Sequence, residues 1–189
     1  MIETSRLVLT SLRPDDSERF FAYRSDEAVS LYQGWMPIDR EAASEFIRGQ
    51  LKVPFGQSGE WCQLAIRSSE AGELIGDVGV HFPADRDDAL ELGISICSPE
   101  QRKGFAKEAL AGCIDTAFRD WGYRRIVASV DPRNVASMGL FESLGFRKEA
   151  HHLESLWFRG EWADDVVFAL LAREWSKTGP LQGQPRPAD

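Results

Sequence analysis

The feature that most constrains this chain is a strand pattern that leads through a short basic loop into a long helix pattern. Residues 90–97 alternate, with apolar side chains at positions 92, 94 and 96 and polar or small ones between them. The loop Gln101-Arg102-Lys103-Gly104-Phe105-Ala106 follows, and a single apolar stripe predicts a helix over 103–121. A basic glycine loop at a helix start presents backbone N–H groups that suit a phosphate. We therefore expect a phosphate-bearing ligand at residues 101–106.

The remaining patterns predict one mixed α+β domain over residues 1–176, with a mostly antiparallel sheet. About seven strands are expected, at residues 6–10, 61–67, 74–82, 90–97, 125–130, 146–158 and 162–171. About four helices are expected, one after the start signal at residues 14–17 and the others at 40–51, 103–121 and 135–144. Residues 177–189 hold three prolines and are expected to form a disordered tail.

Charge and hydropathy narrow the functional classes. The net charge of −8 over 189 residues makes nucleic acid an unsuitable partner, because phosphate contacts need a basic face. An acidic surface either favours a cationic substrate or serves solubility. No apolar run is long enough to span a bilayer, and the first residues lack the apolar core of a signal peptide. We expect a cytoplasmic protein that does not bind membranes.

The cysteines predict neither a disulfide framework nor a metal site. There are three, Cys62, Cys97 and Cys113, widely separated and without the paired spacing of zinc ligands. Each lies in an apolar strand or helix pattern, so we expect buried free thiols and no metal.

Three motifs, in order along the chain, resemble those of the GNAT acetyltransferases. They are Gln101-x-x-Gly104-x-Ala106, Asn134-x-x-Ser137 and the triplet Leu144-Gly145-Phe146. The opening residues 4–9 and the closing residues 160–175 are similar to the branch that acetylates ribosomal-protein alanine. The resemblance covers roughly residues 4–176 and implies a twisted sheet whose central strands, 90–97 and 125–130, splay apart.

The resemblance implies acetyl-CoA as the cosubstrate. Its pyrophosphate would bind the backbone N–H groups of residues 102–107, and its pantetheine arm would lie along the strand that includes residues 94–96. A backbone N–H near Ile96 or Cys97 would stabilise the developing oxyanion. The implied cofactor-binding residues are Ile94, Ser95, Ile96, Gln101, Arg102, Lys103, Gly104, Phe105, Ala106, Asn134 and Ser137.

Acyl transfer to an amine needs a group that removes a proton, because a protonated amine has no lone pair. Glu91 is our candidate base, since it leads the central strand and matches an acidic residue of the resembling branch. The alternative interpretation is a surface carboxylate that faces solvent. His81, near a strand end, is placed to line the acceptor cleft.

The departing thiolate needs a proton donor. Many GNAT enzymes use a tyrosine in the helix before the Gly-Phe pair, but this chain has Phe141 there. The resemblance suggests Ser137 instead, with Asn134 bonding the cofactor. Asn134 is also a suitable N-cap, and Ser137 could serve only that helix end.

We therefore predict an N-acetyltransferase in which the amine attacks the thioester directly, since no Cys/His nucleophile arrangement is present. The acceptor is either a protein N-terminal α-amine or a small amine. Because Phe141 lacks a hydroxyl, the rival hypothesis is a catalytically silent acyl-CoA-binding domain. A homodimer is compatible with the implied fold.

Overall fold

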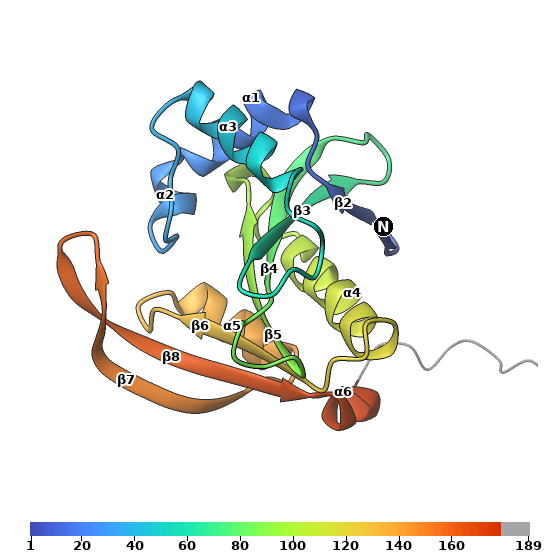
Figure 1. Cartoon of the computed structure of the whole chain (residues 1–189), viewed down its shortest axis with the longest axis vertical. Helices are drawn as coiled ribbons and strands as arrows, with labels where there is room; N and C mark the ends of the chain where they lie inside the picture. Colours follow the sequence, from blue (N-terminus) through green and yellow to red (C-terminus); the bar gives the residue numbers. More distant parts are fainter. Residues whose placement is uncertain (179–189) are drawn as a thin grey trace, which may run out of the picture.

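The computed structural model of the chain describes residues 1–178, which form a single open sheet with helices around it (Figure 1). Two 3-10 turns, Pro14–Asp16 and Ser98–Glu100, precede α1 and the basic loop. The elements are β1 (Ile2–Glu3), β2 (Leu7–Ser11), α1 (Ser17–Arg24), α2 (Glu27–Ser30), α3 (Arg40–Gln50), β3 (Trp61–Ser68), β4 (Leu74–His81), β5 (Ala89–Ile96), α4 (Phe105–Arg119), β6 (Arg125–Val130), α5 (Val135–Ser143), β7 (Arg147–Phe158), β8 (Glu161–Leu171) and α6 (Ala172–Thr178).

The sheet is split at its only parallel pair among the described strands. The strand order is β1-β2-β3-β4-β5-β6-β8-β7, and every other neighbouring pair is antiparallel. Within the described residues, β5 and β6 pair only at Ala89 with Arg125, Leu90 with Ile126 and Glu91 with Val127. Beyond Glu91 the strands diverge into two arms, which is visible in Figure 1. The predicted splay is therefore confirmed.

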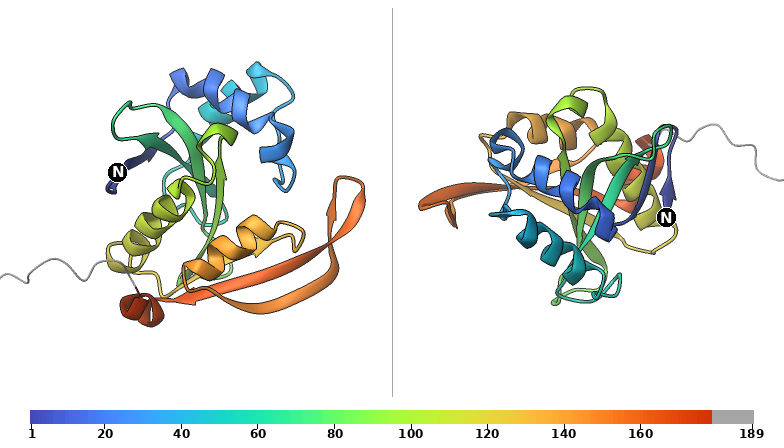
Figure 2. Two further views of the ribbon diagram at one scale, coloured as in Figure 1. Left: turned by 180° about the vertical axis from the view of Figure 1, so that it is seen from behind. Right: turned by 90° about the horizontal axis from the view of Figure 1, so that it is seen from above.

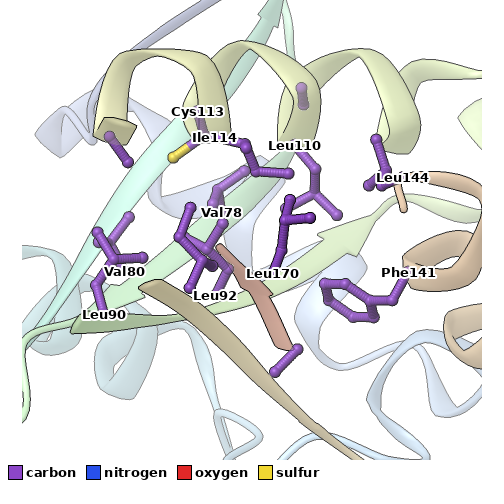
Figure 3. Close-up of a cluster of buried hydrophobic side chains, with 14 of the residues drawn as sticks. Val78, Val80, Leu90, Leu92, Leu110, Cys113, Ile114, Phe141, Leu144 and Leu170 are labelled. Atoms are coloured by element: carbon purple, nitrogen blue, oxygen red, sulfur yellow. The ribbon is translucent and has the colours of Figure 1, made fainter. Parts of the chain in front are cut away.

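Helix α4 packs against one face of the sheet, chiefly on the arm that contains β5. Its apolar stripe, which includes Leu110, Cys113 and Ile114, is fully buried against the sheet (Figure 3). The facing side chains Val78 and Leu90 come from β4 and β5 and have no exposed area. Burying one such side chain stabilises the fold by about 1.5–3 kcal/mol. The core thus lies directly behind the divergence of β5 and β6.

The β7–β8 hairpin and helices α1–α3 face each other across the opening (Figures 1 and 2). The hairpin turns at Arg159-Gly160, as predicted, and both residues have positive φ. The Arg159 guanidinium donates to the carbonyl oxygen of Ser30 at 2.8 Å, so the hairpin tip is joined to α2. The opening is thereby bounded on both sides.

The predicted elements differ from the observed ones at a few places. The short strand β1 and helices α2 and α6 were not predicted, which raises the described totals to eight strands and six α-helices. Helix α4 begins at Phe105 rather than 103, because Gly104 has φ 84° and so lies outside the helix. The tail is predicted from residue 177, whereas α6 extends to Thr178; the rest of the predicted tail, residues 179–189, lies outside the described residues.

No helix in the described part of the chain is long and apolar enough to cross a membrane.

Candidate active site

Two adjoining cavities occupy the opening between β5 and β6. The first, which we call the Glu91 cavity, measures about 330 Å³ and is walled by β5, β6 and the β7–β8 hairpin. The second, the loop cavity, measures about 480 Å³ and lies against α2, α5 and the loop at residues 100–107. The residues that line both are Tyr32, Gln33, Ile94, Asn134 and Ser137. A ligand that extends through both cavities would pass between β5 and α5.

The loop at residues 101–106 turns sharply into α4 and leaves backbone N–H groups free. Arg102 has φ 61° and Gly104 has φ 84°, and these left-handed conformations bend the chain into the first turn of α4. Within residues 1–178, the backbone N–H groups of residues 102–107 donate no hydrogen bond to another backbone group. They lie at the positive end of the helix dipole, where an anion is favoured. Gln101 Nε2 donates to the carbonyl oxygen of Ile96 at 2.9 Å and so ties the loop to β5.

Only part of the loop's positive charge faces the loop cavity. Arg102 and Lys107 line it, whereas Lys103 Nζ pairs with Glu100 at 3.0 Å. The Phe105 ring packs under the Arg6 guanidinium, 4.5 Å from the ring centre. Lys103 and Phe105 therefore contribute backbone groups to the loop, while their side chains make structural contacts.

Strand β5 presents a free backbone edge to the opening. The N–H of Cys97 donates to the carbonyl oxygen of Ile75 on β4 at 2.9 Å. Since an antiparallel ladder alternates, the N–H and carbonyl groups of Ile94 and Ile96 point the other way, toward the opening, where the Ile96 carbonyl is already bound by Gln101 Nε2. Of the two oxyanion donors expected from sequence, the Cys97 N–H is therefore engaged elsewhere. The Ser95 hydroxyl is buried without a partner in the described part of the chain, and Ser95 lines the loop cavity.

Glu91 faces the cavity that bears its name. Its side chain is 26% exposed, and Glu91 is the last residue of β5 that pairs with β6. Burial raises the pKa of the Glu91 carboxyl above its ordinary value; His81 opposes this effect and Asp165 reinforces it. Glu91 is therefore a half-buried carboxylate in a cavity, not a solvent-facing one.

His81 lies behind Glu91 rather than in the cavity wall. The two residues are direct cross-strand partners, and His81 Nδ1 is 3.5 Å from Glu91 Oε2. Trp61 lines the Glu91 cavity and stacks on the His81 ring, with the centroids 4.9 Å apart. The prediction that His81 lines the cleft was therefore wrong, because its neighbours Glu91 and Trp61 line the cavity and His81 does not.

The family assignment follows from a match to a domain model. The family described as Acetyltransferase (GNAT) domain matches residues 6–147. The chain belongs to the GNAT acetyltransferase family. That range includes the basic loop, Glu91 and the whole of α5, whereas the β7–β8 hairpin, which also walls the Glu91 cavity, lies almost wholly beyond it.

Two relatives extend the assignment over nearly the whole chain. It is 30% identical over 174 residues to the uncharacterized N-acetyltransferase p20 of Bacillus licheniformis, covering 92% of this chain and 97% of that protein. It is 28% identical over 180 residues to the [ribosomal protein uS5]-alanine N-acetyltransferase of Escherichia coli, covering 93% of this chain and 92% of that one. The predictions of an N-acetyltransferase and of a likeness to this branch are confirmed, and no comparison supports the catalytically silent alternative.

Solved structures share the fold. A GNAT acetyltransferase from Bacillus anthracis has a TM-score of 0.81 at 23% identity and covers 92% of this chain and 99% of its own. A spermidine N-acetyltransferase from Vibrio cholerae, in complex with CoA and spermine, has a TM-score of 0.78 at 20% identity with the same coverage, 92% and 99%. The predicted mixed α+β GNAT fold is thus confirmed.

The start of α5 places two GNAT motif residues where the cavities join. Asn134 Oδ1 accepts from the Ser137 N–H at 3.1 Å, so Asn134 is the N-cap of α5, as predicted. Both residues line both cavities and therefore lie where the two cavities meet. Phe141 is 3% exposed and packs edge-on against Phe146 at 5.1 Å. Phe141 also lines the Glu91 cavity, but it has no hydroxyl that could donate a proton there.

A long-range anchor beneath the loop was missed by the sequence analysis. Glu108, in the first turn of α4, accepts from Thr4 Oγ1, from the Arg6 N–H and from Arg6 Nε, each at 2.7 Å. These bonds outweigh partial burial and hold the pKa of Glu108 below its ordinary value. The N-terminal segment therefore fixes the start of α4, and a sequence signal existed only as the resemblance over residues 4–9.

The described part of the chain contains no cluster of three or more His, Cys, Asp or Glu side chains that could hold a metal ion. Cys62 and Cys113 are buried free thiols as expected, whereas Cys97 is half-buried.

Proposed function

We propose that this GNAT enzyme acetylates a primary amine held in the Glu91 cavity, with acetyl-CoA bound in the loop cavity. The observation that carries the proposal is the junction of the two cavities at Ile94 and Ser137. It lets an acetyl donor and an amine approach each other from opposite sides, beside Glu91. Acetyl-CoA, when bound, supplies the acetyl thioester.

The residues of the loop cavity fit a coenzyme A ligand. The free N–H groups of residues 102–107, with Arg102 and Lys107, suit its pyrophosphate. The outward N–H and carbonyl groups of Ile94 and the outward N–H of Ile96 suit an extended arm with amide groups, which would add to the sheet as a strand does. The side-chain oxygen of Asn134 accepts a hydrogen bond from the Ser137 N–H, so the amide N–H₂ of Asn134 remains available to the cofactor.

Glu91 acts as the base in this proposal. An α-amine has a pKa near about 8 and a lysine-type amine near about 10.4, so either arrives largely protonated. The Glu91 carboxylate accepts that proton, directly or through one water. Its raised pKa improves the match between base and amine. Ser137 donates a hydrogen bond to the departing sulfur.

The proposed acceptor is a protein N-terminal α-amine. The uS5-alanine relative acts on such an amine according to its name and matches this chain over nearly its full length. Asp131 and Asp164 also line the Glu91 cavity, and a cationic amine is favoured there. A small amine remains the alternative, because a cavity of about 330 Å³ also suits a small molecule.

The test is mass spectrometry of purified enzyme with acetyl-CoA and a panel of amines. The panel holds peptides that begin with alanine or serine, spermidine and glucosamine. We expect acetylated alanine peptide, and a fall in kcat of about 10²-fold or more for Glu91→Gln. Ser137→Ala should also lower kcat, while calorimetry shows unchanged CoA affinity for both variants.

Ser143→Ala is the matched control on the same helix, because the Ser143 hydroxyl bonds only the Leu140 carbonyl in the described residues. Its turnover should equal that of the wild type. If spermidine or glucosamine is acetylated instead of the peptides, the acceptor is a small amine. If no amine is acetylated and CoA does not bind, the proposed function is wrong.

A further inference from the structure

Glu91 has a neighbour on the side away from its cavity. His81 Nδ1 is buried, lacks a hydrogen-bond partner in the described residues and lies 3.5 Å from Glu91 Oε2. That distance is slightly too long for a formed hydrogen bond, but a small side-chain movement closes it. The side chain of His81 is 23% exposed to solvent. The imidazole therefore contacts both the carboxylate and solvent.

Trp61 holds this imidazole in place. The indole and imidazole planes differ by 12° at a centroid distance of 4.9 Å. The indole lies over Gly79, where an added Cβ would meet its ring at 3.0 Å. Gly93, the cross-strand partner of Gly79, also has no side chain to displace the indole, whose ring would lie 3.9 Å from an added Cβ. Trp61 and Glu91 line the Glu91 cavity and His81 does not, so an acceptor in the cavity would contact Glu91 rather than His81.

The proposed reaction requires a route for a proton. An amine R–NH₃⁺ loses two protons when its nitrogen forms the bond to the acetyl carbon and becomes an amide. One of them goes to the sulfur as the C–S bond breaks, and the other must leave for solvent. A bound acceptor covers the cavity side of Glu91, so the cavity is a poor exit.

We propose that His81 is a positioning residue that acts through Glu91, orienting the carboxylate and relaying this proton to solvent. The proton moves from the amine to Glu91, and from Glu91 Oε2 to His81 Nδ1. The imidazolium then releases one proton to water, and Glu91 is again a carboxylate. This inference rests on the proposed function of Glu91.

The other charged groups around Glu91 do not offer the same route. Asp165 on β8 reinforces the raised pKa of Glu91, and its carboxylate accepts from the Ser129 hydroxyl at 2.5 Å. Asp131 and Asp164, which line the same cavity, are paired with Arg133 and His151. The β6 partner of Glu91 is the apolar Val127.

The first test needs no acceptor. Carbon-13 NMR of the side-chain carboxyls follows Glu91 with pH in the wild type, in His81→Phe and in His152→Gln. Phenylalanine keeps the stack on Trp61 but removes both nitrogens, and the Glu91→Gln spectrum assigns the signal. We expect the Glu91 pKa to rise in His81→Phe, because His81 lowers it in the wild type. It should not change in His152→Gln, whose side chain is exposed.

The second test measures turnover of the alanine peptide against pH. A relay predicts a kcat that falls by about 10²-fold in His81→Phe, with little change in KM and a displaced acid limb. Added imidazole should restore turnover to His81→Ala but have no effect on His152→Ala. A loss that is equal at every pH and is not rescued, or an unchanged Glu91 titration, would refute the inference. An enzyme that acetylates no amine refutes the proposed function instead, while the titration still decides whether the pair is coupled.

Discussion

Replacing Arg24 should weaken both the fold and the acceptor side of the site. Arg24 on α1 is 7% exposed and Asp77 on β4 is fully buried. Arg24 Nε donates to Asp77 Oδ1 at 3.1 Å, its Nη2 donates to Oδ2, and Tyr23 donates to the same carboxylate at 2.5 Å. Arg24 Nη1 also donates to Gln33 Oε1 at 3.3 Å. Since Gln33 lines both cavities, one buried ion pair supports the junction.

The magnitude follows from the burial of the pair. Arg24→Leu leaves the Asp77 carboxylate buried without its counter-charge, which costs about 3–5 kcal/mol of unfolding free energy. For a chain of this size each kcal/mol lowers Tm by about 2–4 °C, so Tm should fall by roughly 6–20 °C. Arg19→Leu is the control, because its pair with Glu73 is about half exposed and contributes about 1 kcal/mol or less.

The assay is urea unfolding followed by circular dichroism, with thermal scans beside it. The double variant Arg24→Leu/Asp77→Leu should recover part of the loss, because it removes both buried charges. Arg24→Leu should also raise the KM of the acceptor more than that of acetyl-CoA. If Arg24→Leu loses no more stability than Arg19→Leu, the reasoning from burial is refuted.

Two further predictions concern single positions. Gly76→Ala should destabilise the sheet by about 1–3 kcal/mol or more in urea unfolding, because a Cβ there would lie 2.2 Å from the carbonyl oxygen of Ser95. The control is Gly139→Ala, which should be neutral or stabilising because nothing lies within 4 Å of an added Cβ. Equal effects of the two substitutions on the unfolding free energy would contradict the contact argument. The hydrogen bond from Arg125, joined by Arg147, holds the pKa of Glu149 at about 2. A carboxyl whose pKa is lowered by folding stabilises the protein fully at pH values above its unfolded pKa of about 4.3. This stabilisation is lost as the pH falls toward the pKa of the folded state. Glu149→Gln should therefore lower Tm at pH 7 and have no effect near pH 2, and a Tm loss that is the same at both would exclude the charge as its cause.

The parts of the fold that depend on nearby residues could be predicted. Gly104 directly precedes the first residue of α4, Phe105, and the apolar stripe of that helix is largely buried as its spacing indicates. Asn134 caps α5 through a residue three positions away. Helix α2, with four residues, is too short to leave a periodic signal. Helix α6 follows β8 without a break, so no turn residue marks the boundary.

The site depends on contacts that sequence patterns do not contain. Glu91 was chosen through resemblance, but only β4–β5 pairing places His81 beside it. A slip of one residue in that register would turn the His81 side chain to the opposite face. Asp77 and Arg24 are 53 positions apart, and Glu108 and Thr4 are 104 apart.

The sequence by itself determined the basic loop, the helix behind it and the succession of the longer strands along the chain, because backbone conformation and amphipathic spacing are set by neighbouring residues. Only the tertiary structure decided which polar side chains face one another in the opening between β5 and β6. Long-range pairing brings together residues whose separation along the chain carries no information about their distance in space. The basic loop could therefore be predicted from the sequence, whereas the contacts around Glu91 form only in the folded chain.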